Sequence, residues 1–203
     1  MYSVTAPTSK FEEQLISTAS DCDLFEGYPA GHSARVAEAA DRLAEVFGMN
    51  ENDRLLLQQA ALIRNIGEVL MAREYISEPR QLTALERTDL QRHPVIGEQS
   101  AAKLELPRSV QLIVRWHHEW WNGMGYPDAL SGDAIPLAAR LLRVVDSYFA
   151  LINERPFRNA MTEQMARQHL VDWAAIEFDP SVVKAFLEMP LAGHDLPSDS
   201  ELI

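Results

Sequence analysis

Apolar residues recur at helical spacing along almost the whole chain, and this pattern limits the fold to a helical one. One apolar stripe lies within Arg35–Phe47 and a second within Asp53–Ile63. Residues three and four positions apart share one face of a helix, so each stripe predicts an amphipathic helix. Alternation of apolar and polar residues, which indicates a strand, never continues for more than a few positions. The sequence therefore predicts an all-α fold.

Capping residues predict where further helices begin. Thr83-x-x-Glu86 has the pattern of a capping box, for a helix that continues through about Gln91. Proline suits the first turn of a helix, and three prolines stand at such positions: Pro94, Pro107 and Pro136. The helix from Pro136 is expected to end near Ile152. Two more N-caps are expected at Thr162 and Asp179, and Gly48 is expected to terminate the first stripe.

Charge and length exclude several classes of partner. The chain has 203 residues and a net charge of -12, whereas nucleic acids and anionic membranes attract basic surfaces. No apolar run reaches the roughly 18 residues of a membrane-spanning helix, and the first residues do not resemble a signal peptide. The single cysteine, Cys22, excludes an internal disulfide. We therefore expect a cytoplasmic protein that binds neither nucleic acid nor membrane.

Periodicity also suggests the domain organisation. The first ~20 residues and the last ~13 lack a strong apolar pattern, and no internal repeat is present. We therefore expect one helical domain over residues 21–189, an N-terminal segment 1–20 and a loose C-terminal tail 190–203.

Four histidines and one aspartate are candidate metal ligands. The histidines lie at or near predicted helix ends: His32, His93, His117 and His118. Asp146 lies within the apolar stripe of the helix that Pro136 begins. A buried carboxylate must be paired or bind a cation, and ligands from separate helices are how a bundle builds an internal metal site. Taken singly, each histidine is better explained as an ordinary core or surface residue, whereas the five groups together favour a metal site because their order and spacing match a pattern.

The order of these groups, together with a glycine-rich loop, resembles a known family. The motifs that carry the resemblance lie between about residue 25 and about residue 189: Gly31-His32-Ser33, His93-Pro94-x-x-Gly97, His117-His118-Glu119, Gly123-x-Gly125-Tyr126-Pro127, Val144-x-Asp146, Arg155-Pro156-Phe157-Arg158 and Phe178-Asp179-Pro180. In this order they resemble the HD-GYP family.

The resemblance implies a fold, an activity and a set of site residues. The family's fold is an all-α HD-domain bundle with a Gly-Tyr-Pro loop between helices, here Gly125, Tyr126 and Pro127. Its members hydrolyse cyclic diguanylate at a centre of two or three metals, commonly iron or manganese. Metal-ligand positions are implied at 64 and 65 and at His32, His93, His117, His118 and Asp146. Contacts to the dinucleotide are implied at Tyr126, Arg155 and Arg158, although two arginines in a loop are often simply solvated.

The chain departs from the family at its signature His-Asp dyad. Positions 64 and 65 hold Arg64 and Asn65, and the lysine expected after the following Ile-Gly is Glu68. Arginine cannot ligate a metal, and asparagine offers one neutral oxygen in place of a bridging carboxylate. The first metal position then retains only His32 and Asp146. The second retains the other three histidines, with Asn65 as a weak fourth ligand. We therefore expect at most one divalent metal ion, or none.

Two interpretations of Arg64 follow from this departure. Its guanidinium can occupy the first metal position and pair with Asp146, which would neutralise the carboxylate without a metal. Alternatively, Arg64 and Glu68 form an exposed pair at i,i+4 spacing on a helix. The neighbouring tripeptide Gly27-Tyr28-Pro29 lies outside the family pattern, and we interpret it as a chance turn.

Three functions remain compatible with the sequence. The first is a degenerate, weak or inactive HD-GYP domain that binds cyclic diguanylate or a partner protein. For a partner, the resemblance suggests diguanylate cyclase domains bound through the Gly-Tyr-Pro loop. The second is an active phosphodiesterase with a reduced, single-metal site. The third is a structural signalling module without a ligand.

Overall fold

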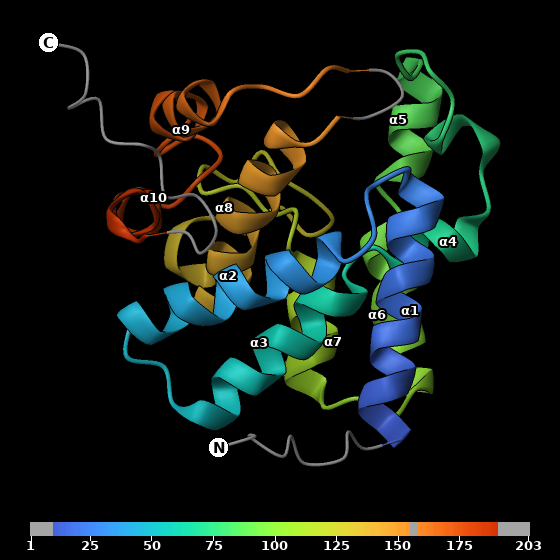
Figure 1. Cartoon of the computed structure of the whole chain (residues 1–203), viewed down its shortest axis with the longest axis horizontal. Coiled ribbons are helices and arrows are strands. Elements are labelled where there is room, and N and C mark those ends of the chain that lie inside the picture. The colour runs from blue at the N-terminus through green and yellow to red at the C-terminus, as the bar shows by residue number, and fades with distance from the viewer. Residues whose placement is uncertain (1–9, 155–157, 191–203) are drawn as a thin grey trace, which may run out of the picture.

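The centre of the fold is formed by α2 (His32–Val46), which crosses α3 (Glu51–Ile63) and α8 (Leu137–Ile152) (Figure 1). This computed structural model describes residues 10–154 and 158–190. Much of each predicted apolar stripe is buried, with Val36 and Leu43 on α2 and Leu141 and Leu142 on α8 at 0% exposed. Burial of these side chains provides the main drive for folding.

The stripe expected on α3 is wrong in part: Leu55 is 47% exposed and Leu56 and Leu62 are only partly buried, whereas Leu57 is the fully buried leucine. Val46, at the end of α2, is also exposed.

The other helices surround this centre. In chain order they are α1 (Lys10–Glu26), α4 (Ile66–Met71), α5 (Ala84–Leu90), α6 (His93–Lys103), α7 (Arg108–Trp116), α9 (Glu163–Asp172) and α10 (Pro180–Glu188), with 3-10 helices at Glu74–Ile76 and Gly132–Ala134. Over the described ranges the structure contains no strand, only one isolated bridge between Ala174 and Phe178. The all-α prediction is confirmed. None of the helices in these ranges is long and apolar enough to cross a membrane.

Most predicted helix starts are confirmed by their caps. Thr83 and Glu86 form both hydrogen bonds of the capping box. Thr162 and Asp179 each accept a hydrogen bond from a backbone N–H of the helix that they begin. Pro94 lies in a first turn as predicted, but two other prolines stand one position earlier, at the N-cap itself: Pro107 and Pro136.

The N-terminal segment differs from the prediction. Residues 10–26 form α1, which packs against α2, α3 and α4, so the boundary expected at residue 20 falls inside a helix. The buried face of α1 carries Leu15, Ala19 and Cys22 but also two acidic residues, Asp23 and Glu26. Those carboxylates interrupt the apolar stripe, and the periodicity is therefore weak. Of the predicted tail, residues 191–203 lie outside the described part of the chain.

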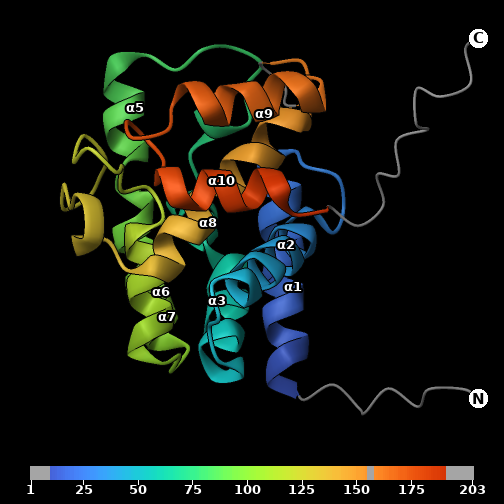
Figure 2. The ribbon, with the colours of Figure 1, turned by 90° about the vertical axis from the view of Figure 1, so that its left-hand side faces the viewer.

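Close packing of α4 on α6 places the first candidate ligand. The two helices pack against each other, and α7 lies next to α6 (Figure 2). A Cβ atom at Gly67 would lie 2.0 Å from the backbone carbonyl oxygen of His93. Only glycine permits this approach, so α4 packs directly against the backbone at the start of α6. This packing places His93, the first residue of α6, beside His117 and His118, which follow α7.

Candidate metal and ligand site

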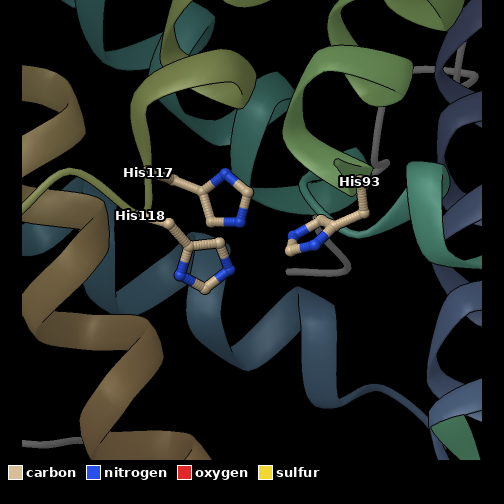
Figure 3. A group of neighbouring side chains, drawn as sticks. All are labelled: His93, His117 and His118. Atoms are coloured by element: carbon tan, nitrogen blue, oxygen red, sulfur yellow. The ribbon is translucent and has the colours of Figure 1, made fainter. Parts of the chain in front are cut away.

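Three histidines form a cluster that can hold a metal ion. His93 begins α6, and His117 and His118 directly follow α7. One ring nitrogen from each residue lies within 4.8 Å of the others, and the three rings converge on one point (Figure 3). Three imidazoles at such spacing suit a divalent transition metal.

Backbone carbonyls fix the ring orientation of two of these histidines. Nδ1 of His93 lies 2.8 Å from the carbonyl oxygen of Leu90, and Nδ1 of His117 lies 2.6 Å from that of Val114. A carbonyl only accepts, so both Nδ1 atoms carry the proton and both Nε2 atoms keep a lone pair. These two Nε2 atoms are buried and lack a hydrogen-bond partner among the described residues. Buried lone pairs of this kind fit a bound metal, and the carbonyls provide the orientation that metal-binding histidines require.

Burial keeps the cluster uncharged. It lowers the pKa of His93 to about 4, against a smaller opposing effect of the Leu90 hydrogen bond. Burial and the neighbouring His93 lower the pKa of His117 to about 3, and burial places the pKa of His118 well below its usual range. All three rings are therefore neutral at pH 7, which is the form that binds metal.

A guanidinium lies where the family resemblance implies a first metal position. Nε of Arg64 donates to Asp146 at 2.5 Å, and Nη1 donates to the Ser33 hydroxyl at 3.0 Å and to a backbone carbonyl of α3. Arg64 is 1% exposed. The predicted Arg64–Asp146 pair is confirmed, and the alternative of a surface pair with Glu68 is wrong because Arg64 lies in the interior.

The ion pair determines the charge state of Asp146. Burial, the largest single effect, raises the pKa of this carboxyl, but Arg64 together with smaller contributions from His117, His32 and Arg143 lowers it to about 2. Asp146 is therefore ionised at neutral pH and balanced by a cation from its own chain. His32, the other ligand implied at this position, is fully buried and its ring stacks on Tyr28 at 3.7 Å between centroids. Gly27 lies in a turn as expected, and the Tyr28 side chain that follows it is buried against His32.

A cleft of about 300 Å³ opens beside the histidine cluster. His118 and Asn65 line it, and its charged lining residues are Glu26, Glu68, Asp146, Glu177, Arg143 and Arg158. Asn65 donates from Nδ2 to Glu26 at 3.0 Å, while its Oδ1 is buried without a hydrogen-bond partner in the described ranges. Four carboxylates thus face two guanidiniums across the cleft, so its balance of charge is negative.

Sequence reasoning missed several of these lining residues. Arg143 donates to Nδ1 of His118 at 2.8 Å and pairs with Glu177. Its position three residues before Asp146, on the same helical face, is a signal that could have revealed it. Glu26 and Glu177 come from other elements, α1 and the segment before α10, and no spacing in the sequence connects them to the histidines.

The Gly-Tyr-Pro loop packs directly onto the cluster. The Tyr126 ring stacks on His118 with 4.9 Å between centroids, and the Tyr126 N–H donates to the His118 carbonyl at 3.2 Å. A Cβ atom at Gly125 would lie 2.2 Å from the backbone nitrogen of Trp120, so only glycine fits there. The peptide bond between Tyr126 and Pro127 is cis.

The Glu119 side chain fixes the residues that follow the Gly-Tyr-Pro tripeptide, through Asp128 and Leu130. The carboxylate is buried, and its two oxygens accept the backbone N–H groups of Asp128 at 2.7 Å and Leu130 at 2.9 Å. A carboxylate that accepts two amide hydrogens fixes both of them in place. The histidine pair and the loop are therefore one folded unit.

The two predicted dinucleotide-contacting arginines have different outcomes. Arg158 lines the cleft and donates to the carbonyls of Ala150 and Leu151 near the end of α8. Arg155 lies outside the described residues. The ligand roles of Arg158 and Tyr126 stay predictions.

Comparison with known proteins identifies the class to which this site belongs. A family model described as an HD domain matches residues 23–182. The chain is 32% identical over 177 residues to the cyclic di-GMP phosphodiesterase response regulator RpfG of Xanthomonas campestris, covering 86% of this chain and 47% of RpfG. It is 39% identical over 139 residues to a cyclic di-GMP phosphodiesterase of Vibrio cholerae, covering 65% of this chain and 28% of that protein. The chain spans less than half the length of these relatives.

Solved structures share the fold. A cyclic GMP-AMP specific phosphodiesterase of Vibrio cholerae superposes with a TM-score of 0.68 at 19% identity, over 87% of this chain and 47% of that one. An HD-GYP protein of Bdellovibrio bacteriovorus gives 0.63 at 20% identity, over 77% and 50%. The helical bundle with its histidine cluster is an HD domain. Within that family the chain belongs to the HD-GYP group, as a member whose dyad positions hold Arg64 and Asn65.

Replacement of Arg64 by methionine tests the internal ion pair. Asp146 would remain buried without its partner, so Arg64→Met should lower the free energy of unfolding by about 3–5 kcal/mol in urea denaturation. The Asp146 pKa of about 2 lies below that of an unfolded chain. The pair therefore contributes its full stability above about pH 4 and loses it as the pH falls toward 2, where the two proteins should converge.

The double variant Arg64→Met/Asp146→Leu is the matched control. It removes both charges, and apolar side chains of similar volume should recover most of the lost stability. Equal stability of wild type and Arg64→Met at pH 7 would contradict the role assigned to the pair.

A second prediction concerns Glu119. In Glu119→Gln an amide NH₂ must face one of the two backbone N–H groups, which leaves a buried donor unsatisfied and costs about 1–3 kcal/mol. Hydrogen exchange should show faster exchange of the Asp128 and Leu130 amides. The exposed Glu38→Gln is the control and should leave both rates unchanged. Unaltered protection of the two amides in Glu119→Gln would refute the assignment.

Proposed function

We propose that this chain is a degenerate HD-GYP domain that binds a cyclic dinucleotide, with at most one divalent metal ion and with little or no hydrolysis. The observation that carries the proposal is the contrast between the two metal positions. Arg64 is ion-paired to Asp146 at the first position, whereas His93 and His117 retain buried, unpartnered Nε2 atoms at the second. A two-metal reaction needs both positions, but ligand recognition can use one.

The names of the relatives support a cyclic dinucleotide as the ligand. RpfG and the Vibrio cholerae proteins are named as phosphodiesterases for cyclic di-GMP or for 3'3'-cGAMP. Both compounds carry two phosphodiester groups and two purine bases. The cleft offers guanidiniums from Arg143 and Arg158, and guanidiniums suit phosphate oxygens.

The charge of the cleft supports a metal-dependent form of binding. Four carboxylates and two arginines line it, so a dianionic dinucleotide meets net repulsion in the metal-free protein. One divalent cation on the histidine cluster would cancel that excess of negative charge. If iron or manganese is bound there, it supplies the positive charge that the cleft otherwise lacks.

A single-metal phosphodiesterase is the second candidate, because a three-histidine cluster can by itself activate a water molecule. Under the main proposal, incubation of manganese-loaded protein with cyclic di-GMP yields no linear product at a useful rate. Sustained formation of linear dinucleotide would favour this alternative.

Binding of a partner protein, such as a diguanylate cyclase domain, at the Gly-Tyr-Pro loop is a further proposal that rests on the family resemblance.

Metal dependence of ligand binding is the main test. Calorimetry with cyclic di-GMP should detect binding to manganese-loaded protein and at least about tenfold weaker binding after chelation, a factor equal to ~1.4 kcal/mol. His117→Asn is the matched control, because the asparagine amide can still donate to Val114 while the Nε2 ligand is lost. Equal affinity for cyclic di-GMP with and without metal would contradict the role assigned to the metal charge. No binding of cyclic di-GMP in either state would overturn the proposed function.

Restoration of the dyad tests the first metal position. Arg64→His/Asn65→Asp should raise the metal content from at most one to two ions per chain in mass spectrometry, because ligands replace the guanidinium. Without metal the double variant should be less stable than wild type, since residue 65 would place a carboxylate beside buried Glu26. Asn65→Asp alone is the control and should gain no second ion while Arg64 holds Asp146. Two ions in the wild type would contradict this account.

A further inference from the structure

Arg143 lies between the histidine cluster and Glu177, at a position that the family motifs do not explain. One Nη of Arg143 is 2.8 Å from Nδ1 of His118, and the other pairs with Glu177. The Arg143 side chain is 14% exposed and lines the cleft. Its Nε is buried without a hydrogen-bond partner in the described part of the chain.

The hydrogen bond to Arg143 determines the tautomer of His118. A guanidinium only donates, so Nδ1 of His118 must accept. A neutral imidazole has one lone pair and one N–H, and the proton of His118 therefore lies on Nε2. His93 and His117 have the opposite tautomer, with the proton on Nδ1. Two of the three histidines thus offer a lone pair at Nε2, while the lone pair of the third is already used by Arg143.

We infer that Arg143 competes with a divalent cation for His118 and, once displaced, binds a phosphodiester in the cleft. A metal among the three rings needs a lone pair on Nε2 of His118, the ring nitrogen that faces His93 (Figure 3). In that tautomer Nδ1 carries the proton and cannot accept from Arg143. The displaced guanidinium keeps its pair with Glu177 and lines the cleft with Arg158. The inference rests on the proposed function, because it takes a metal ion and a cyclic dinucleotide as the two ligands.

Competition at His118 couples the two binding events. Metal binding releases a guanidinium for phosphate, so each ligand should increase the affinity for the other by the same factor. Arg64 has no such role, because it is buried behind the cleft and held by Asp146 and Ser33. Of these two arginines, Arg143 is the one that lines the cleft and can exchange partners.

Metal affinity provides the first test, with Mn²⁺ as the probe and calorimetry as the measurement. Removal of the competitor in Arg143→Met should tighten Mn²⁺ binding by about tenfold, the factor expected for one charged hydrogen bond. Arg140→Met, one turn earlier on α8, removes the same charge but leaves the His118 bond intact, because Arg140 pairs with Asp133 and Asp179. The Arg140→Met control should change Mn²⁺ affinity much less than Arg143→Met does. A merely structural role for Arg143 predicts weaker metal binding instead.

Nitrogen chemical shifts of the histidine rings report the tautomer directly, and a change in net charge alone does not alter the tautomer. In metal-free wild type, long-range proton–nitrogen spectra should show His118 protonated at Nε2 and His93 and His117 protonated at Nδ1. His118 should lose this fixed tautomer in Arg143→Met and keep it in Arg140→Met. A wild-type His118 that is protonated at Nδ1 would overturn the inference.

Cyclic di-GMP completes the experiment and separates the two proposals. Manganese-loaded Arg143→Met should bind the dinucleotide about tenfold more weakly than wild type, the loss of one charged hydrogen bond. If wild type binds both ligands but Arg143→Met binds Mn²⁺ no more tightly, the inference fails and the proposed function stands. If wild type binds no Mn²⁺, the inference fails, and if wild type binds no cyclic di-GMP with or without metal, both fail.

Discussion

A single buried guanidinium joins four helices of this domain. Arg64, at the end of α3, donates to Asp146 on α8 and to Ser33 in the first turn of α2. The Ser33 hydroxyl and N–H in turn donate to Asp23 of α1. A buried carboxylate that loses its partner destabilises a protein strongly, whereas a satisfied pair is tolerated. The centre of the bundle is therefore balanced by a cation that the chain itself supplies.

The two arginines at the centre, Arg64 and Arg143, differ in burial and in hydrogen-bond partners. Under the proposed function, this difference allows the domain to bind a dinucleotide without cleaving it. Arg64 is almost fully buried and committed to protein acceptors, so under the proposed function it closes the first metal position. Arg143 lies at the cleft and donates to His118, so under the inference above it contests the second position without closing it. Under the proposed function, recognition of a dinucleotide needs only the second position, and hydrolysis by two metals needs both.

The sequence predicted the local structure well and the long-range charge partners only in part. Apolar periodicity and caps located most helices, because both signals depend on neighbouring residues. The Arg64–Asp146 pair was predictable, since a family pattern placed both residues at one metal position. α1 was not predicted, because Asp23 and Glu26 occupy its buried face. Those carboxylates make sense only beside partners on other helices, and no local pattern records such partners. Glu177 was missed for the same reason, since its role depends on α8.

The Gly-Tyr-Pro loop shares its supports with the histidine cluster. Tyr126 stacks on His118, and the backbone at Trp121 donates to the carbonyl of Glu177, whose carboxylate pairs with Arg143. A displacement of the loop by a ligand or a partner would therefore reach Arg143 through one backbone hydrogen bond and one ion pair. The same displacement would also weaken the stacking of the Tyr126 ring on His118. The loop thus shares contacts with the histidine cluster, although the loop itself contributes none of the three clustered imidazoles.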